Sequence, residues 1–248
     1  MAASRNPVLA RAGFDDAGAL DSAAGATMTL AGTIWKTLLL LGIAAMGTLY
    51  AWSGMPGIGL SDAAIYPLMI GGFVAGVALL LATSFNPEIA VVTGPVYAAL
   101  QGVVLGVVTM VLNVQYPGLP YQALVLTTAV LLVMLTVYRT GLITVTDQLR
   151  SIIISCTGAI FMFYVIAFGM SLFGLYIPFL HEGGLIGIGF SLFVVGLAAF
   201  NLLLDFDLIE RGIGKAPAQL EWFAAFGLVV TLIWMYFEIL RLLRKLQR

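Results

Sequence analysis

The chain has 248 residues, of which 61% are hydrophobic and 9% are charged, and its formal net charge at pH 7 is −1. This composition is not that of a soluble domain, and it offers no basic surface for nucleic acid. A single cysteine, Cys156, and a single histidine, His181, argue against a disulfide, a zinc site or a Cys–His catalytic pair. We therefore expect a polytopic membrane protein that is not an enzyme, with any metal chemistry limited to oxygen ligands, which suit Ca²⁺.

The first residues differ in composition from the rest of the chain. Residues 1–29 contain Arg5, Arg11 and three aspartates among small side chains, without the apolar core and cleavage site of a secretory signal. We expect this segment to be a mobile cytoplasmic tail. Residues 30–248 are then expected to form a single seven-helix transmembrane domain.

Apolar runs separated by turn signals predict seven membrane-spanning helices. Their expected ranges are 32–52, 63–83, 88–112, 121–139, 151–173, 184–210 and 219–243. Each range is long enough for a bilayer, which needs about 17–25 apolar residues in a helix. Pro95 lies inside the third range, where a proline is expected to kink the helix.

The distribution of Lys and Arg predicts the orientation, because basic residues collect in cytoplasmic loops. The basic residues expected on one side are Arg5, Arg11, Lys36, Arg139, Arg150, Arg211 and Lys215. The loops expected on the other side, near 53–62, 113–120 and 174–183, contain none. This pattern predicts a cytoplasmic N-terminus, although with seven spans the four basic residues after position 240 would face outward.

Three of the acidic residues in the last two apolar ranges adjoin long apolar stretches. Glu238 follows the apolar stretch 223–237, and Asp205 and Asp207 close the preceding range. A bare carboxylate inside a bilayer is costly, so each acid must be paired, protonated or hydrated. Such intramembrane acids are therefore candidates for a functional role.

The spacing of these acids from basic residues separates local pairs from unpaired groups. Asp207 precedes Arg211 by four residues and Glu238 precedes Arg241 by three, and both spacings allow a pair on one helix. Asp205 has no such local partner, because leucine and isoleucine occupy the positions three and four residues further on. Another helix or water must then satisfy Asp205.

A contact between Asp205 and Glu238 would have a chemical consequence. Two adjacent carboxylates cannot both be ionised comfortably, so the pair would share a proton, and deprotonation would create repulsion or a cation site. A plain antiparallel hairpin argues against this contact, because Asp205 would face roughly residue 224, about 21 Å along the helix from Glu238. The acids meet only if residues 212–224 form a longer connection or the last helix slides.

Other basic residues have simpler interpretations. We interpret Lys36 as an anchor at the membrane interface, beside Trp35 in an aromatic belt. Arg139 and Arg150 flank a short loop and are expected mainly to set the topology, although either could reach an acid on a neighbouring helix. A retinal protein is excluded because residues 222–240 contain no lysine.

The final segment, 235–246, resembles the terminal-helix signature of the Bax inhibitor-1 (transmembrane Bax inhibitor motif) family, specifically its bacterial YccA-like branch. In that signature an acid within an aromatic and aliphatic run precedes a basic end. The segment Leu-Leu-Asp-Phe-Asp at 203–207 resembles a second family signature, an aspartate that ends the sixth helix. Residues 86–102 resemble the third-helix region, and the similarity covers most of the chain.

This resemblance implies a bundle of six helices around a central seventh, and a pH-sensitive Ca²⁺ leak controlled by acids at Asp205 and Glu238. The chain departs from the family pattern in three ways. Position 238 is Glu instead of Asp, the stretch between the acids is longer, and residues 63–83 lack the arginine that latches one acid in relatives. The candidates for a latch elsewhere are Arg139, Arg150, Lys36 and Arg241.

We expect a pH-sensitive leak of the bacterial inner membrane that passes Ca²⁺ or another cation, with Asp205, Glu238 and Asp207 as gate and ion-binding residues. Ca²⁺ would bind Asp205 and Glu238 as the permeant ion, protons would regulate it, and no tightly bound cofactor is expected. Beyond the lipid bilayer, a membrane protease is a candidate partner. The competing hypothesis is a scaffold that restrains such a protease or a stress complex without moving ions, and a proton-coupled solute carrier is a third.

Overall fold

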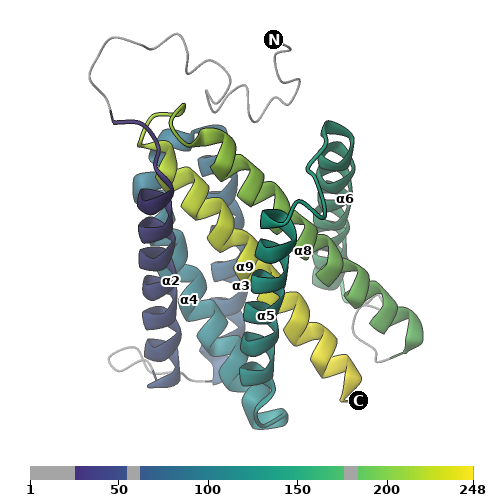
Figure 1. Ribbon diagram of the computed structural model, residues 1–248. Coiled ribbons are helices and arrows are strands. Elements are labelled where there is room, and N and C mark those ends of the chain that lie inside the picture. Colours follow the sequence, from purple (N-terminus) through teal and green to yellow (C-terminus); the bar gives the residue numbers. More distant parts are fainter. Residues whose placement is uncertain (1–25, 55–61, 176–183, 248) are drawn as a thin grey trace. The chain divides into compact units, whose positions relative to one another are not determined.

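The structure is a computed structural model that describes residues 26–54, 62–175 and 184–247 (Figure 1). These residues form seven long helices and the 3-10 turn η1 (Pro87–Ile89). The helices are α2 (Leu30–Trp52), α3 (Asp62–Phe85), α4 (Ala90–Gln115), α5 (Leu119–Arg139), α6 (Asp147–Leu172), α8 (Leu185–Gly212) and α9 (Leu220–Leu246). Each of them is long and apolar enough to cross a membrane. The predicted seven spans are therefore confirmed.

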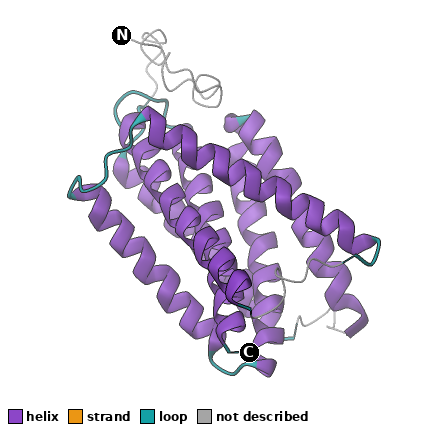
Figure 2. Ribbon diagram, turned by 90° about the vertical axis from the view of Figure 1, so that its right-hand side faces the viewer, coloured by secondary structure: helices purple, strands orange, loops and turns teal. Residues whose placement is uncertain are grey.

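The described part of the chain contains no strand, as Figure 2 shows, and only one isolated bridge links extended residues. Helix boundaries differ from the predicted ones where a capping residue extends a helix. The fifth span, α6, begins at residue 147 instead of 151, because the Thr146 side chain accepts a hydrogen bond from the Leu149 N–H. The last span, α9, continues to residue 246, and Arg244 and Lys245 in its last turn suit the negative end of the helix dipole.

The described residues group into two compact units. Unit 1 comprises the described residues of 1–115 together with Leu208–Val230, and so it holds α2, α3, α4, the end of α8 and the first part of α9. Unit 2 comprises Tyr116–Asp207 and Thr231–Arg248, and so it holds α5, α6, most of α8 and the last part of α9. The single domain expected over 30–248 stays a prediction.

In unit 1, small residues let α2 and α4 pack backbone against backbone. A Cβ atom added to Gly106 would lie 2.7 Å from the Thr48 carbonyl oxygen, and one added to Gly47 would lie 2.8 Å from the Ala99 carbonyl oxygen. The Thr48 hydroxyl donates to the Gly102 carbonyl at 3.0 Å. Close approach of this kind is how helices associate in membranes.

Unit 1 also includes an extended connection between residues 26–29 and 214–218. The Met28 N–H donates to the Ala216 carbonyl at 2.7 Å, and the Gly214 N–H donates to the Met28 carbonyl at 2.9 Å. Met28 is fully buried and belongs to a core cluster with Ile209 and Leu220. The last four residues of the predicted tail are therefore packed in place, whereas the rest of the tail, with Arg5 and Arg11, lies outside the described residues.

In unit 2, side chains of α6, α8 and α9 form a common core. Ile153 and Ile160 pack with Val194 and Leu197, and Trp234 of α9 covers this cluster. Of the seven described helices, α9 has the largest share of buried residues.

Candidate functional site

Polar side chains of unit 2 follow one face of α9. Thr231, Glu238 and Lys245 are spaced seven residues apart, and seven residues turn a helix by about 700°, so the three side chains share a face. All three are buried. We call Thr231, Glu238 and Lys245 the polar stripe. A row of buried polar groups in a membrane-spanning helix needs partners on other helices.

Helix α8 supplies partners at both ends of the polar stripe. The Thr231 hydroxyl hydrogen-bonds to Asp205, and the Lys245 ammonium donates to the Ser191 Oγ atom at 2.9 Å. Asp205 and Ser191 are fourteen residues apart on α8, as Thr231 and Lys245 are on α9. The two helices therefore run antiparallel in a constant register.

This register separates the two acids that the sequence suggested as a pair. Glu238 lies seven residues after Thr231, which is about 10 Å along the helix axis from the level of Asp205. Midway between the two contacts, Glu238 is level with Ala198 of α8, which is fully buried. The structure does not bring Asp205 and Glu238 into a shared-proton pair. Each acid has its own partners.

Asp205 is the acid whose hydrogen bonds are incomplete. Its Oδ2 atom is buried and has no hydrogen-bond partner among the residues that the structure describes. One turn earlier on α8, Asn201 donates to the Thr157 hydroxyl at 2.8 Å and to the Leu197 carbonyl at 2.9 Å. An ionised carboxylate with an unsatisfied buried oxygen is unfavourable, so Asp205 favours a proton, a water molecule or a cation.

Glu238 has a complete set of partners. The Arg241 Nη1 atom donates to Oε1 at 3.0 Å and to Oε2 at 2.9 Å, and the Tyr164 hydroxyl donates to Oε2 at 3.2 Å. Arg241 also donates to the Tyr164 oxygen, and its guanidinium carbon lies 4.7 Å from the centre of the tyrosine ring. Of the predicted latch residues, Arg241 thus holds Glu238, by the local pairing that its spacing allowed.

Asp207 forms an ion pair with a different helix. The Arg150 Nη2 atom of α6 donates to the Asp207 Oδ2 atom, and both residues are only 8% exposed. Arg150, which was expected mainly to set the topology, therefore latches Asp207 rather than Asp205. Arg150 lies 57 residues before Asp207, so spacing along one helix does not reveal this pair.

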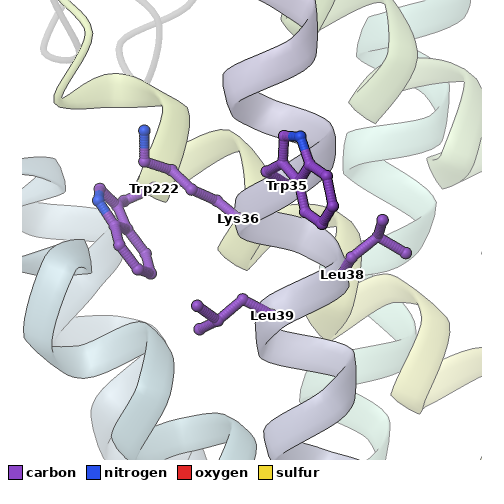
Figure 3. A pocket seen from close by; sticks show the side chains of 5 residues that line it. All are labelled: Trp35, Lys36, Leu38, Leu39 and Trp222. Carbon is purple, nitrogen blue, oxygen red and sulfur yellow. The ribbon is translucent and has the colours of Figure 1, made fainter.

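Lys36, a further latch candidate, belongs to unit 1, and its recorded partners are residues of that unit. Its ammonium pairs with Glu221 and lies 5.6 Å from the centre of the Trp222 ring. Figure 3 shows Lys36 and Trp222 on a pocket that Trp35, Leu38 and Leu39 also line. Thr29 donates to Glu221 through its N–H at 2.7 Å and through its hydroxyl at 2.9 Å.

Arg139 completes the latch candidates. It lies exposed in the last turn of α5, and within the described residues it has no recorded hydrogen bond or ion pair. Arg139 is therefore not a latch in this structure. Helix-end basic residues of this kind fit the topological role that the sequence suggested.

The arrangement does not form a resident metal site. No group of three or more His, Cys, Asp and Glu side chains gathers anywhere in residues 26–54, 62–175 and 184–247. Ca²⁺ usually takes six to eight oxygen ligands, and Asp205 and Glu238 lie two helical turns apart. The expected pair of Ca²⁺ ligands is therefore not assembled. A passing ion would meet the two acids one after the other.

Tyr164 is a site residue that sequence reasoning missed, as it missed Thr231. Tyr164 contacts Glu238 from 74 positions earlier in the chain, and no spacing rule connects residues so far apart. The sequence offers one indication of a role for Tyr164, which is its position in the middle of a largely apolar span. Tyrosine is more common at the two membrane interfaces, where its hydroxyl reaches water.

Seven apolar helices with acids and bases buried between them define an integral membrane protein with intramembrane charges. The chain matches the family model described as Bax inhibitor 1 like over residues 6–248. It therefore belongs to the Bax inhibitor 1 like family, and the family predicted from the sequence is confirmed. A search of curated proteins and a search of solved structures each found no match.

Proposed function

We propose that this protein is a cation leak, with Ca²⁺ as a permeant ion, and that protonation of Asp205 controls the leak. The observation that supports this most directly is the buried Asp205 Oδ2 atom without a hydrogen-bond partner among the described residues. When protonated, Asp205 is neutral and attracts no cation. When ionised, it draws water and cations into an otherwise apolar layer, so the leak increases as the pH rises.

Glu238 has a separate role in this proposal. Its charge is balanced by Arg241 and hydrogen-bonded by Tyr164. Removing the acid leaves the Arg241 charge uncompensated beside the polar stripe, where it repels cations. Glu238→Gln should therefore lower the flux at every pH, while Asp205→Asn should remove its pH dependence. A shared proton would instead make the two substitutions act alike.

Membership of the Bax inhibitor 1 like family supports a role in the membrane. We place the protein in the bacterial YccA-like branch and in the inner membrane, with the N-terminus in the cytoplasm, because the basic residues of the loops favour one side. Labelling of single cysteines introduced near residues 26 and 142 from either side of intact cells would test this orientation. Both positions are expected to be protected from an impermeant reagent added outside.

The leak is tested with purified full-length protein in liposomes that contain a Ca²⁺ dye. Influx is measured from about pH 6 to about pH 8 for the wild type, Asp205→Asn and Glu238→Gln. The matched control is Glu88→Gln, because Glu88 is an exposed acid in η1 and is not part of the polar stripe. Wild type and control should show an influx that rises with pH.

Two results would contradict the proposal. No influx above that of empty vesicles, from folded protein at any pH, would exclude the leak and favour a scaffold that restrains a membrane protease. An influx whose pH dependence is the same in Asp205→Asn and the wild type would exclude Asp205 as the controlling acid.

A further inference from the structure

Lys245 is a buried cation that has no role in the leak proposed above. It lies in the last turn of α9 and is only 2% exposed. Its Nζ atom donates to the Gly187 carbonyl oxygen at 2.8 Å and to the Ser191 Oγ atom at 2.9 Å. Both distances are those of good N–H···O and N–H···O–H hydrogen bonds. Both oxygens belong to the beginning of α8.

These two oxygens have the chemistry of a cation site. Backbone carbonyl oxygens replace the water of a monovalent cation in channel filters, and a buried hydroxyl can do the same with its lone pairs. Gly187 and Ser191 are four residues apart, so the Gly187 carbonyl and the Ser191 side chain lie next to each other on one face of α8. Ser191 is fully buried, so no bulk water competes for its oxygen.

The position of Lys245 connects this site to the controlling acid. Lys245 ends the polar stripe, two turns beyond Glu238, while Thr231 and Asp205 lie two turns before Glu238. The unsatisfied acid is thus at one end of the row and a tethered positive charge is at the other, about 21 Å away along the helix. A cation that moves along the stripe must pass both.

We propose that the Gly187 carbonyl and the Ser191 hydroxyl form a site for an ammonium-sized monovalent cation, and that Lys245 fills this site as a tethered cation that limits passage along the polar stripe. This inference rests on the proposed leak and adds a second point of control to it. Lys245 occupies the oxygens that a permeant ion would use, and its charge repels that ion.

A purely structural role for Lys245, as a clamp between α8 and α9, makes a different prediction. Lys245→Met keeps the length and most of the apolar contacts of the side chain but removes its charge and its hydrogen bonds. The tethered cation predicts that Ca²⁺ influx rises in this variant while the protein stays folded. A clamp predicts lower stability without higher influx.

The first arm of the experiment measures Ca²⁺ influx into liposomes for the full-length wild type, Lys245→Met, Lys245→Ala and Ser191→Ala. Both lysine variants should leak at least about fivefold faster than the wild type, the factor expected for removing one unit charge about 4 Å from an ion even in water. Ser191→Ala should give a smaller increase. The control is Lys215→Met, because Lys215 is exposed in the loop between α8 and α9, and its influx should equal that of the wild type.

The second arm uses chemical rescue, which does not depend on transport. Lys245→Ala leaves room for the atoms it removes, and n-propylammonium has the same three carbons and ammonium group. Millimolar n-propylammonium should raise the melting temperature of Lys245→Ala in detergent and lower its influx towards that of the wild type. Neither change should occur in Lys245→Met, whose side chain fills the space.

The outcomes separate this inference from the proposed function. Suppose that the wild type leaks and Asp205→Asn alters the leak, but the lysine variants leak like the wild type. The proposed role of Lys245 is then contradicted, whereas the proposed leak is not. If no protein leaks but n-propylammonium still stabilises Lys245→Ala alone, the cation site stands, and its role in transport is wrong together with the leak. If neither rescue nor higher influx occurs, the site itself is overturned.

Discussion

The contact of Glu238 with Arg241 and Tyr164 predicts that replacing Arg241 lowers the free energy of unfolding more than replacing Glu238. Glu238 is 2% exposed, whereas the Arg241 side chain is 28% exposed. If Arg241 is removed, a buried carboxylate keeps only the Tyr164 hydroxyl as a partner. If Glu238 is removed, the guanidinium can still reach water at its exposed edge and keep its contact with the tyrosine ring.

The magnitudes follow from these contacts. Breaking a buried ion pair by removing one partner usually costs about 3–5 kcal/mol, and the partial exposure of Arg241 places Arg241→Gln at the lower end, about 3 kcal/mol. Glu238→Gln keeps a hydrogen-bonding side chain and should cost about 1 kcal/mol. In the double variant no charge is left unpaired, so its loss should be close to that of Glu238→Gln, about 1 kcal/mol.

The assay is reversible unfolding in mixed detergent micelles, with the free energy of unfolding compared among the wild type, the two single variants and the double variant. Tyr164→Phe adds a measure of the third member, with an expected loss of about 1 kcal/mol for one hydrogen bond to a charged group that keeps its other partner. Equal losses in the two single variants, or a double variant whose loss equals their sum, would refute the argument that Glu238 is the buried, dependent member.

Two further predictions concern packing and pairing elsewhere. Arg150→Met removes an ion pair of the buried Asp207 carboxylate and should lower the free energy of unfolding by about 3 kcal/mol. Arg139→Met, at an exposed helix end, should change it by less than about 0.5 kcal/mol. Similar losses for both would show that the burial of Asp207 is not decisive. Gly106→Ala places a Cβ atom 2.7 Å from a backbone carbonyl oxygen of α2 and should cost about 1–3 kcal/mol in the same unfolding assay. Gly42→Ala, where no atom lies within 4 Å, should be neutral or stabilising, and equal effects at the two glycines would contradict close α2–α4 packing.

The spans were predictable because their signal is local. A run of apolar residues of membrane length and the turn residues that end it lie within one stretch of sequence, and so they identify each helix without tertiary information. The i,i+3 spacing of Glu238 and Arg241 was visible for the same reason. The absence of a local partner likewise marked Asp205, whose Oδ2 atom is the unsatisfied oxygen in the structure.

The remaining contacts of the site depend on how helices pack, which spacing does not reveal. Glu221 lies 185 residues from Lys36, and Tyr164 lies 74 residues from Glu238. A plain hairpin would place Asp205 opposite residue 224, whereas Asp205 hydrogen-bonds to Thr231. Residues 214–218 also hydrogen-bond to residues 26–28, so this connection is more than a plain hairpin turn.

The pairing of residues 26–29 with 214–218, and of Thr29 with Glu221, has a consequence for how the chain is made. The hydrogen-bond partner of Thr29, Glu221, lies 192 residues further along the chain. At about 5–20 residues per second, a ribosome needs roughly 10 to 40 s to reach Glu221 after it has passed Thr29. Helix α2 is therefore synthesised long before the partner of its first residues exists. The hydrogen bonds at the start of α2 can form only after the beginning of α9 has been made.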